Sequence, residues 1–231
     1  MQLLCDEMKV QKDFLLPLPT GAQPSDLEKI RDVFLENQSA ILSLVIQKKD
    51  LLSKKDYAYL VKSISTVTMG SFEDSAVQKL FFGACNRPNA IYVPSMNKVF
   101  VCPSLARFPE STLRQILAHE LGHSVQRLQK VIPCFQEYTK AQSREAFADW
   151  VASKVLSESI RLEADPAVAK KNAFESQLLF LSLACETQPK NKPDWSPSHP
   201  SLQSRIEGIF LSQPAFQKAL HCEAKSPKVC G

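Results

Sequence analysis

Two histidines four residues apart constrain this chain more than any other feature, in the segment His119-Glu-Leu-Gly-His123. On a helix, residues at this spacing leave the same face about one turn apart. Two imidazole nitrogens can then bind one Zn²⁺ at about 2.0–2.1 Å. Glu120 lies between the histidines in sequence, so it can stand beside the ion without ligating it and take a proton from water. The segment therefore predicts a helix that carries two zinc ligands and a general base.

The flanking sequence favours this helix over a chance match on an ordinary surface helix. Pro109 followed by an acidic residue is typical of a helix start, and Pro133 lies just beyond the expected end. Four histidines occur in the chain, and two of them belong to the motif. Apolar residues recur at three- and four-residue steps between the prolines, at Leu113, Ile116, Leu117, Leu121, Val125 and Leu128. We therefore expect an amphipathic helix over about 110–132.

A second amphipathic helix, expected over about 142–161, supplies acidic residues for the same site. Catalytic zinc usually has three protein ligands and a water. Glu145 and Asp149 are four residues apart and share one helix face. Glu145 can be the third ligand, and Asp149 can accept the second N–H of a ligand histidine and fix its tautomer. The alternative is that both carboxylates are solvated, as most helix acids are, but the apolar residues between and around them favour the ligand interpretation.

The other two histidines receive different interpretations. His199 lies in a proline- and serine-rich loop that runs into a helix, with Arg205 six residues later. A histidine and an arginine near zinc can stabilise the oxyanion of a tetrahedral intermediate or hold a substrate carbonyl. A lone histidine in a loop is more often simply exposed, and this alternative stays open. His221 has no partner visible in the sequence and is interpreted as structural.

These motifs together resemble gluzincin metallopeptidases, and above all the C-terminal catalytic lobe of the neprilysin family. The resemblance covers about residues 80–230. The segment from Asn89 to Tyr92 is similar to that family's Asn-Ala-x-Tyr strand, and the two motif helices follow in the same order. The Ser-His-Pro-Ser segment around His199 resembles gluzincins of the Ste24 type. Family members are much longer and carry a large helical lobe over the site, so the resemblance implies a minimal relative.

The resemblance implies a role for each matching residue. Zinc, one ion per chain, would be held by two histidines and a glutamate, with a base beside it and a histidine that stabilises the transition state. The substrate backbone would bind to a nearby strand and its carbonyl region to an arginine. The implied residues are the zinc ligands His119, His123 and Glu145, the catalytic residues Glu120 and His199, Asp149 behind a ligand histidine, and the substrate-binding residues Asn89, Ala90 and Arg205.

The pattern as a whole predicts a mostly helical α+β chain. The resemblance implies a zincin catalytic domain, thermolysin-like and neprilysin-like, with a small β-sheet over the active-site helix. We expect an N-terminal helical segment over 1–80 and the catalytic domain over 81–231. In zincins the edge of such a sheet binds substrate as an added strand. Besides the two motif helices, we expect helices over 25–49, 54–64, 72–82, 165–185, 201–211 and 214–221, and strands over 90–94 and 98–102.

Composition argues against nucleic-acid and membrane-spanning classes. The net charge of the 231 residues is only +4, and the basic residues are scattered rather than clustered. The longest apolar run, about 178–185, is far shorter than the ~20 residues of a membrane span. The segment after Met1 carries acidic residues where a signal peptide would be apolar. The chain is therefore cytoplasmic, or it is an exported protein whose signal peptide is absent from this sequence.

Seven cysteines favour export to an oxidising compartment over a set of reduced core thiols. Cys85 and Cys102 flank the two expected strands, so a hairpin would bring them near each other. The neprilysin resemblance implies further pairs. It would join Cys134 to Cys230 and would pair Cys185 and Cys222 with cysteines from the N-terminal side. Only Cys5 then remains there, which leaves one cysteine over.

The sequence thus predicts a zinc metalloendopeptidase that acts on peptides or proteins, as a monomer. One alternative keeps the fold without strong activity: a latent or catalytically weak zincin that serves as a regulatory or peptide-binding protein, with the N-terminal 80 residues over the cleft. Another is a non-enzymatic module with structural zinc. Structural sites are closed by four protein ligands, whereas the motifs supply three and an unused base, so this alternative is disfavoured.

Overall fold

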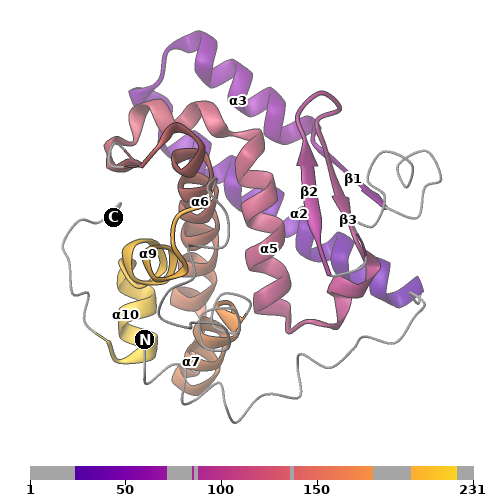
Figure 1. Cartoon of the computed structure of the whole chain (residues 1–231), viewed down its shortest axis with the longest axis vertical. Helices are drawn as coiled ribbons and strands as arrows, with labels where there is room; N and C mark the ends of the chain where they lie inside the picture. The colour runs from indigo at the N-terminus through magenta and orange to yellow at the C-terminus, as the bar shows by residue number, and fades with distance from the viewer. Residues whose placement is uncertain (1–23, 72–84, 86–87, 136–137, 179–198, 223–231) are drawn as a thin grey trace, which may run out of the picture.

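The computed structural model describes residues 24–71, 85, 88–135, 138–178 and 199–222 (Figure 1). Within these ranges the chain is mostly helical and has one small sheet, as expected for α+β. The α-helices are α2 (Pro24–Gln47), α3 (Lys54–Thr66), α5 (Glu110–Ser124), α6 (Lys140–Leu162), α7 (Pro166–Glu175), α9 (Leu202–Arg205) and α10 (Pro214–Leu220). A π-helix, Ile206–Phe210, continues α9. Short 3-10 helices lie at Lys49–Leu51, Pro103–Arg107, Gln126–Val131 and Pro133–Phe135.

The sheet has three strands, β1 (Thr68–Ser71), β2 (Ala90–Val93) and β3 (Lys98–Val101), in the order β1-β3-β2. The two predicted strands form the expected hairpin, with Ala90 opposite Val101. The first strand was not predicted. It is four residues long, contains a glycine and pairs in parallel with β3, so its partner is remote in sequence. Neither its length nor its pattern distinguishes it from a loop.

The helix with the HExxH segment lies at the centre of the fold, between the sheet on one side and α6 on the other (Figure 1). Gly122 explains how closely α5 and α6 approach. A Cβ atom at this position would lie 3.1 Å from the Ala148 Cα and 3.2 Å from the Val151 Cβ. The missing side chain thus lets the two helix backbones pack tightly, which brings the residues of both motifs together.

The α-helix expected over 110–132 is shorter than predicted. It ends at Ser124, and a 3-10 helix continues over Gln126–Val131. At the junction the Val125 N–H bonds to the Gly122 carbonyl in a tighter turn, and the Ser124 carbonyl accepts the Ser63 hydroxyl at 2.9 Å. The Ser124 carbonyl would accept a backbone N–H if the α-helix continued, but here it accepts the Ser63 hydroxyl of α3 instead.

Other predicted boundaries agree to within a few residues where they are described. The expected helix at 165 begins as predicted, with Asp165 as its cap and Pro166 in its first turn, but its α-helical part ends at Glu175. The α6 helix begins two residues earlier than expected because Thr139 forms a capping box with Gln142. The expected helix over 72–82 lies outside the described residues, and so does the stretch 179–185.

Helix α2 shares one hydrophobic core with α5 and α6. Ile30, Phe34 and Ile41 are buried in the same cluster as Leu117 and Trp150. Polar contacts fix this packing: the Asn37 amide donates to the Arg114 carbonyl at 2.9 Å, and the Lys29 ammonium donates to the Ala106 carbonyl at 2.8 Å. The described part of the N-terminal segment thus supports the motif helix directly. The expected boundary near residue 80 lies outside the described residues.

A disulfide joins Cys85 to Cys102, with 5.5 Å between their Cα atoms, as the hairpin suggested. Cys134 is also disulfide-bonded, while its expected partner Cys230 lies outside the described residues. Cys222 is a free thiol, so the pairing that the resemblance implied for this residue is wrong. Its thiol is half-buried, and burial raises its pKa.

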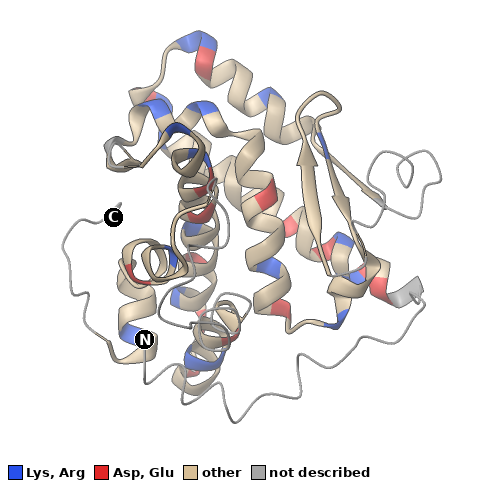
Figure 2. Cartoon of the chain, viewed as in Figure 1, with Lys and Arg blue, Asp and Glu red and all other residues tan. Residues whose placement is uncertain are grey.

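Acidic and basic side chains are interspersed over the helices rather than gathered on one face (Figure 2). This distribution agrees with the expectation of solvated helix faces. Among the described helices, none combines the length and the apolar character needed to cross a bilayer.

Candidate metal centre

Helices α5 and α6 bring together the three residues predicted as zinc ligands. One ligand atom each from His119, His123 and Glu145 lies within 4.8 Å of the other two. Glu145 Oε2 lies 3.2 Å from His119 Nε2 and 3.6 Å from His123 Nε2. Ligands about 2.0–2.1 Å from a tetrahedral zinc ion are separated by roughly 3.3 Å. The spacing and the donor types therefore fit a zinc ion bound between the two helices.

Asp149 orients the first of these histidines. Its Oδ1 lies 2.9 Å from His119 Nδ1, so Nδ1 carries the proton and Nε2 faces Glu145 and the candidate ion position. Asp149 is itself fully buried and accepts two hydrogen bonds from Arg205, at 2.7 and 2.8 Å. The predicted role of Asp149 thus agrees with its position, one turn beyond Glu145 on α6.

These contacts shift the pKa values of His119 and Asp149. Burial alone would lower the pKa of His119, but the nearby carboxylates, with Asp149 foremost, outweigh it and raise this pKa to about 10. Burial likewise opposes ionisation of Asp149, yet the Arg205 charge and the His119 hydrogen bond lower its pKa to about 2. Without metal, His119 is therefore a cation, and a metal ion bound at Nε2 would have to displace a proton.

Glu120 lies in the same pocket but is held by the sheet. The Tyr92 backbone N–H donates to Glu120 Oε2 at 2.8 Å. This bond fixes one carboxylate oxygen and leaves the other available for a proton. A charged acceptor strengthens such a bond, so strand β2 positions the expected base beside the metal ligands.

The same bond shows which residues of β2 face away from β3. Asn89 accepts from the Cys102 N–H at 2.9 Å and thus faces β3. Backbone groups alternate along a strand, so the N–H and C=O groups of Ala90 and Tyr92 point to the opposite side. No described strand pairs with that side of β2. Asn89 and Ala90, both predicted to bind substrate, line the pocket beside this free edge.

His199 lies at the metal centre, as predicted. Its Nε2 is 3.1 Å from Glu145 Oε2, and its side chain is about one-third exposed. Glu145 Oε2 therefore lies within 3.6 Å of an imidazole nitrogen from each of three histidines. Burial raises the pKa of Glu145, but hydrogen bonds from His119, His123 and His199 outweigh it and hold that pKa well below its usual range.

Arg205 occupies a different place from the one predicted. The resemblance implied contact with a substrate carbonyl, but Arg205 is only 5% exposed and is not among the described residues that line the pocket. Its guanidinium is hydrogen-bonded to both oxygens of Asp149. The short helix α9, capped by Ser201, presents Arg205 to the core rather than to the cleft. Its contribution to the site is therefore indirect, through Asp149 and His119.

The metal centre opens into a pocket of about 720 Å³. Several lining residues had no signal in the sequence, because only the fold brings them to the site from α3, the hairpin and the 3-10 helix after α5. Besides the predicted residues, the pocket is lined by Tyr59, Ile91, Tyr92, Pro94, Ser124, Gln126, Arg127 and Arg144.

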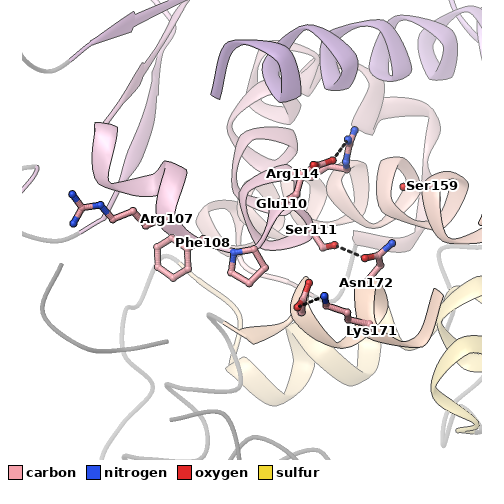
Figure 3. Close-up of a pocket in the computed structure, with 10 residues that line it drawn as sticks. Arg107, Phe108, Glu110, Ser111, Arg114, Ser159, Lys171 and Asn172 are labelled. Carbon is pink, nitrogen blue, oxygen red and sulfur yellow. Dashed lines mark hydrogen bonds and ion pairs between the residues drawn. The ribbon is translucent and has the colours of Figure 1, made fainter. Parts of the chain in front are cut away.

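A second cavity, of about 490 Å³, lies near the first turn of α5 and contains no residue of the metal centre (Figure 3). Its polar groups contact one another. Arg114 pairs with Glu110 at 3.0 Å, and the Ser111 hydroxyl bonds to Asn172 at 3.2 Å. Seven of the nine predicted site residues line the first pocket, and none lines the second.

No protein-family model matches this chain, and the searches of curated proteins and of solved structures found no match. The functional interpretation therefore depends on the geometry of the metal centre.

Proposed function

We propose that the protein is a zinc-dependent metallopeptidase of the gluzincin type, with a minimal zincin fold. The observation that carries this proposal is the convergence of His119, His123 and Glu145 on one point, with Glu120 beside them and outside the ligand set. Two imidazoles and one carboxylate form the donor set of hydrolytic zinc sites of this type, which leave a ligand position open. The base held by strand β2 favours hydrolysis over a purely structural role.

Bound by these ligands, zinc would polarise a substrate carbonyl and lower the pKa of a water toward about 7. The residues of the chain supply the proton transfers. The Glu120 carboxylate takes a proton from the attacking water and delivers it to the leaving amine nitrogen. The His199 imidazole donates a hydrogen bond to the oxyanion that forms on the carbonyl oxygen. Asp149 keeps His119 in the tautomer whose Nε2 is free to bind the ion.

The free edge of β2 supports a peptide as the substrate. Ala90 offers an N–H and a C=O on the side away from β3, next to Glu120. An extended peptide can pair with such an edge as an added strand. Its scissile bond would then lie between the strand and α5, where the base and the ligands are.

The Cys85–Cys102 disulfide supports export of the protein to an oxidising compartment. A thiol count on protein isolated without reducing agent tests this part of the proposal. Oxidised Cys85 and Cys102 are the expected result, and fully reduced cysteines would contradict it.

The test of the activity uses zinc-loaded protein and a mixed peptide library, with cut sites identified by mass spectrometry. We expect cleavage that a chelator abolishes and that zinc restores. Glu120→Gln should retain one zinc per chain and lose at least about 10²-fold in rate, because it removes the base and not a ligand.

The matched control is Glu110→Gln, which changes an exposed carboxylate on the same helix, at its N-terminal end. This variant should cleave at the native rate. A Glu120→Gln variant with near-native turnover would contradict the assignment of the base.

His199 supports a second candidate function. Its Nε2 is as close to Glu145 Oε2 as that of His119, although His199 is not part of the three-residue group that could hold a metal. A movement of His199 toward the other two histidines would supply a fourth protein ligand and close the site. The protein would then be a latent zincin with a regulatory or peptide-binding role. His199→Phe separates the two candidates by zinc stoichiometry and rate. Retained zinc with a lower kcat supports the peptidase, whereas loss of zinc supports the closed site.

A further inference from the structure

The pocket beside the metal centre carries positive charge that the zinc chemistry does not use. The acidic residues among its described lining are Glu120 and Glu145, and both belong to the metal centre. Arg127 and Arg144 line the same pocket and belong to no group that could hold a metal. A molecule that enters the pocket therefore meets two guanidinium groups and no carboxylate outside the metal centre.

Arg127 is held in place without being neutralised. Its guanidinium lies 3.6 Å from the centre of the Tyr59 ring, a stacking contact that restricts its motion. Its acidic partner, Asp56, lies 3.7 Å away and also faces Lys130 at 3.6 Å. One carboxylate thus serves two cations. The Arg127 side chain remains 43% exposed and can accept a second anionic partner.

Arg144 directly precedes the ligand Glu145 on α6 and is exposed. Among the described residues, no carboxylate forms an ion pair with it. By contrast, Arg114 on α5 and Arg161 on α6 each have an acidic partner at 3.0 Å or less. A guanidinium group presents a planar fork of donors that matches a carboxylate. Arg144 therefore offers this fork at the mouth of the metal pocket.

The second cavity provides a contrast. It too contains cationic side chains, but Arg114 faces Glu110 and Lys171 faces Glu175, at 3.0 and 3.8 Å (Figure 3). Of the cationic side chains that line this cavity, Arg114 and Lys171 thus each have a carboxylate partner in the cavity wall itself. In the pocket with the metal centre, by contrast, neither Arg127 nor Arg144 forms an ion pair with a described carboxylate that lines the pocket.

Resting on the proposed peptidase function, we propose that Arg127 and Arg144 form a carboxylate subsite beside the metal centre. Preferred substrates would be peptides with a carboxylate close to the scissile bond. That carboxylate is either an Asp or Glu side chain or the C-terminus of the peptide itself. Electrostatic attraction in a partly enclosed pocket, together with bidentate hydrogen bonds, gives the selectivity.

Binding of four matched peptides tests the subsite directly. They share one sequence, carry either Glu or Gln at the central position and end in either a free acid or an amide. Fluorescence anisotropy measures their binding to zinc-loaded Glu120→Gln protein, which does not consume them, and to metal-free protein. We expect at least about fivefold tighter binding for the preferred carboxylate peptide than for the neutral one, and the peptide arms show which carboxylate is recognised.

Substitutions then assign the preference to the two arginines. Arg144→Gln and Arg127→Gln should each reduce the ratio of the affinity for the preferred carboxylate peptide to the affinity for the neutral peptide. The double variant should bring this ratio to about one. Arg161→Gln is the matched control, because Arg161 lies on the same helix, outside the pocket, and pairs with Glu158. This control should keep the native ratio. Zinc stoichiometry and circular dichroism of each variant verify that it is folded.

Equal binding of all four peptides to the Glu120→Gln protein with both arginines intact would overturn the subsite, and so would a preference that survives in the double variant. Hydrolysis with Glu120 intact, measured in parallel, separates this inference from the peptidase proposal. Cleavage without any carboxylate preference overturns the subsite alone. A carboxylate preference in binding without cleavage of any peptide supports the subsite and overturns the peptidase.

Discussion

At the scale of single residues, Asp149 links the buried core to the metal centre. It contacts His119 at 2.9 Å and Arg205 at 2.7 Å, and it is fully buried. A metal site in which a carboxylate orients a ligand histidine loses affinity when that carboxylate is removed. If the proposed zinc site is correct, the chain Arg205–Asp149–His119 makes zinc binding depend on a residue that does not face the pocket.

Asp149→Asn should therefore weaken zinc binding by about 10–100-fold. It should also lower the free energy of unfolding by about 3–5 kcal/mol, because the buried Arg205 charge loses its carboxylate partner. Zinc titration with a competing chelator and urea unfolding measure the two effects. Asp50→Asn, in the exposed 3-10 helix Lys49–Leu51, is the control and should change neither quantity. Native zinc affinity in Asp149→Asn would show that Asp149 does not orient His119.

Residue spacing within one helix was enough to predict the core of the candidate site. His119 and His123 lie four residues apart on one helix, and so do Glu145 and Asp149 on another, so the positions within each pair follow from helix geometry. The contact between Tyr92 and Glu120 could not be predicted, because it depends on how the hairpin is placed against α5. The position of Arg205 against Asp149 could not be predicted for the same reason, since the orientation of a short helix is set by tertiary packing.

At the scale of secondary-structure elements, the close packing of α5 on α6 determines the geometry of the metal centre. The contact between them is made at Gly122, directly before His123, where a Cβ atom would meet the Ala148 backbone at 3.1 Å. Helix α5 supplies two candidate ligands and α6 the third. Any increase in the separation of the helices therefore moves Glu145 away from both histidines.

Gly122→Ala tests this dependence. Alanine favours a helix by about 1 kcal/mol over glycine, but an inserted methyl group in a tight contact costs about 1–3 kcal/mol. We expect a net loss of stability and a clear loss of zinc affinity, measured by thermal unfolding and chelator competition. Gly208→Ala is the matched control, because its Cβ would meet only the Tyr138 hydroxyl, at 3.9 Å. Unchanged zinc affinity in Gly122→Ala would mean that the helices can separate without disturbing the ligands.

Elements with strong local signals were predicted well, and those that depend on remote partners were not. Helix α7 begins at a cap and a proline that are visible in the sequence. Strand β1 exists because it pairs with β3, about thirty residues later, and no local pattern announces such a strand. The end of α5 at Ser124 likewise depends on the Ser63 hydroxyl from α3.

At the scale of the whole molecule, the metal centre lies between parts of the chain that fold around one core. Helix α2 packs on α5, and both contribute to the cluster that contains Trp150 of α6. Zinc would connect α5 to α6 within this core and would bind the folded chain only, since the ligands converge through tertiary structure. Binding of this kind stabilises the folded state.

Zinc should therefore raise the melting temperature, by an amount that depends on pH. At a free zinc concentration of about 100 times Kd, the stabilisation is about 2.7 kcal/mol, or roughly 5–10 °C for a chain of this size. In the metal-free protein the pKa of His119 is raised to about 10. A pKa raised on folding stabilises the metal-free protein most below the unfolded value of about 6.5, and this contribution is lost as the pH rises toward 10.

Zinc competes with the same proton, so its effect has the opposite dependence on pH. Apparent zinc affinity should rise by up to about tenfold per pH unit between pH 6 and 8, while His119 remains protonated without metal. At a fixed free zinc concentration, the increase in melting temperature should consequently be larger at pH 8 than at pH 6. Differential scanning calorimetry with and without chelator measures both curves. A zinc-induced shift that is independent of pH would mean that the ion displaces no proton from His119, so that this histidine is either neutral in the metal-free protein or outside the ligand set.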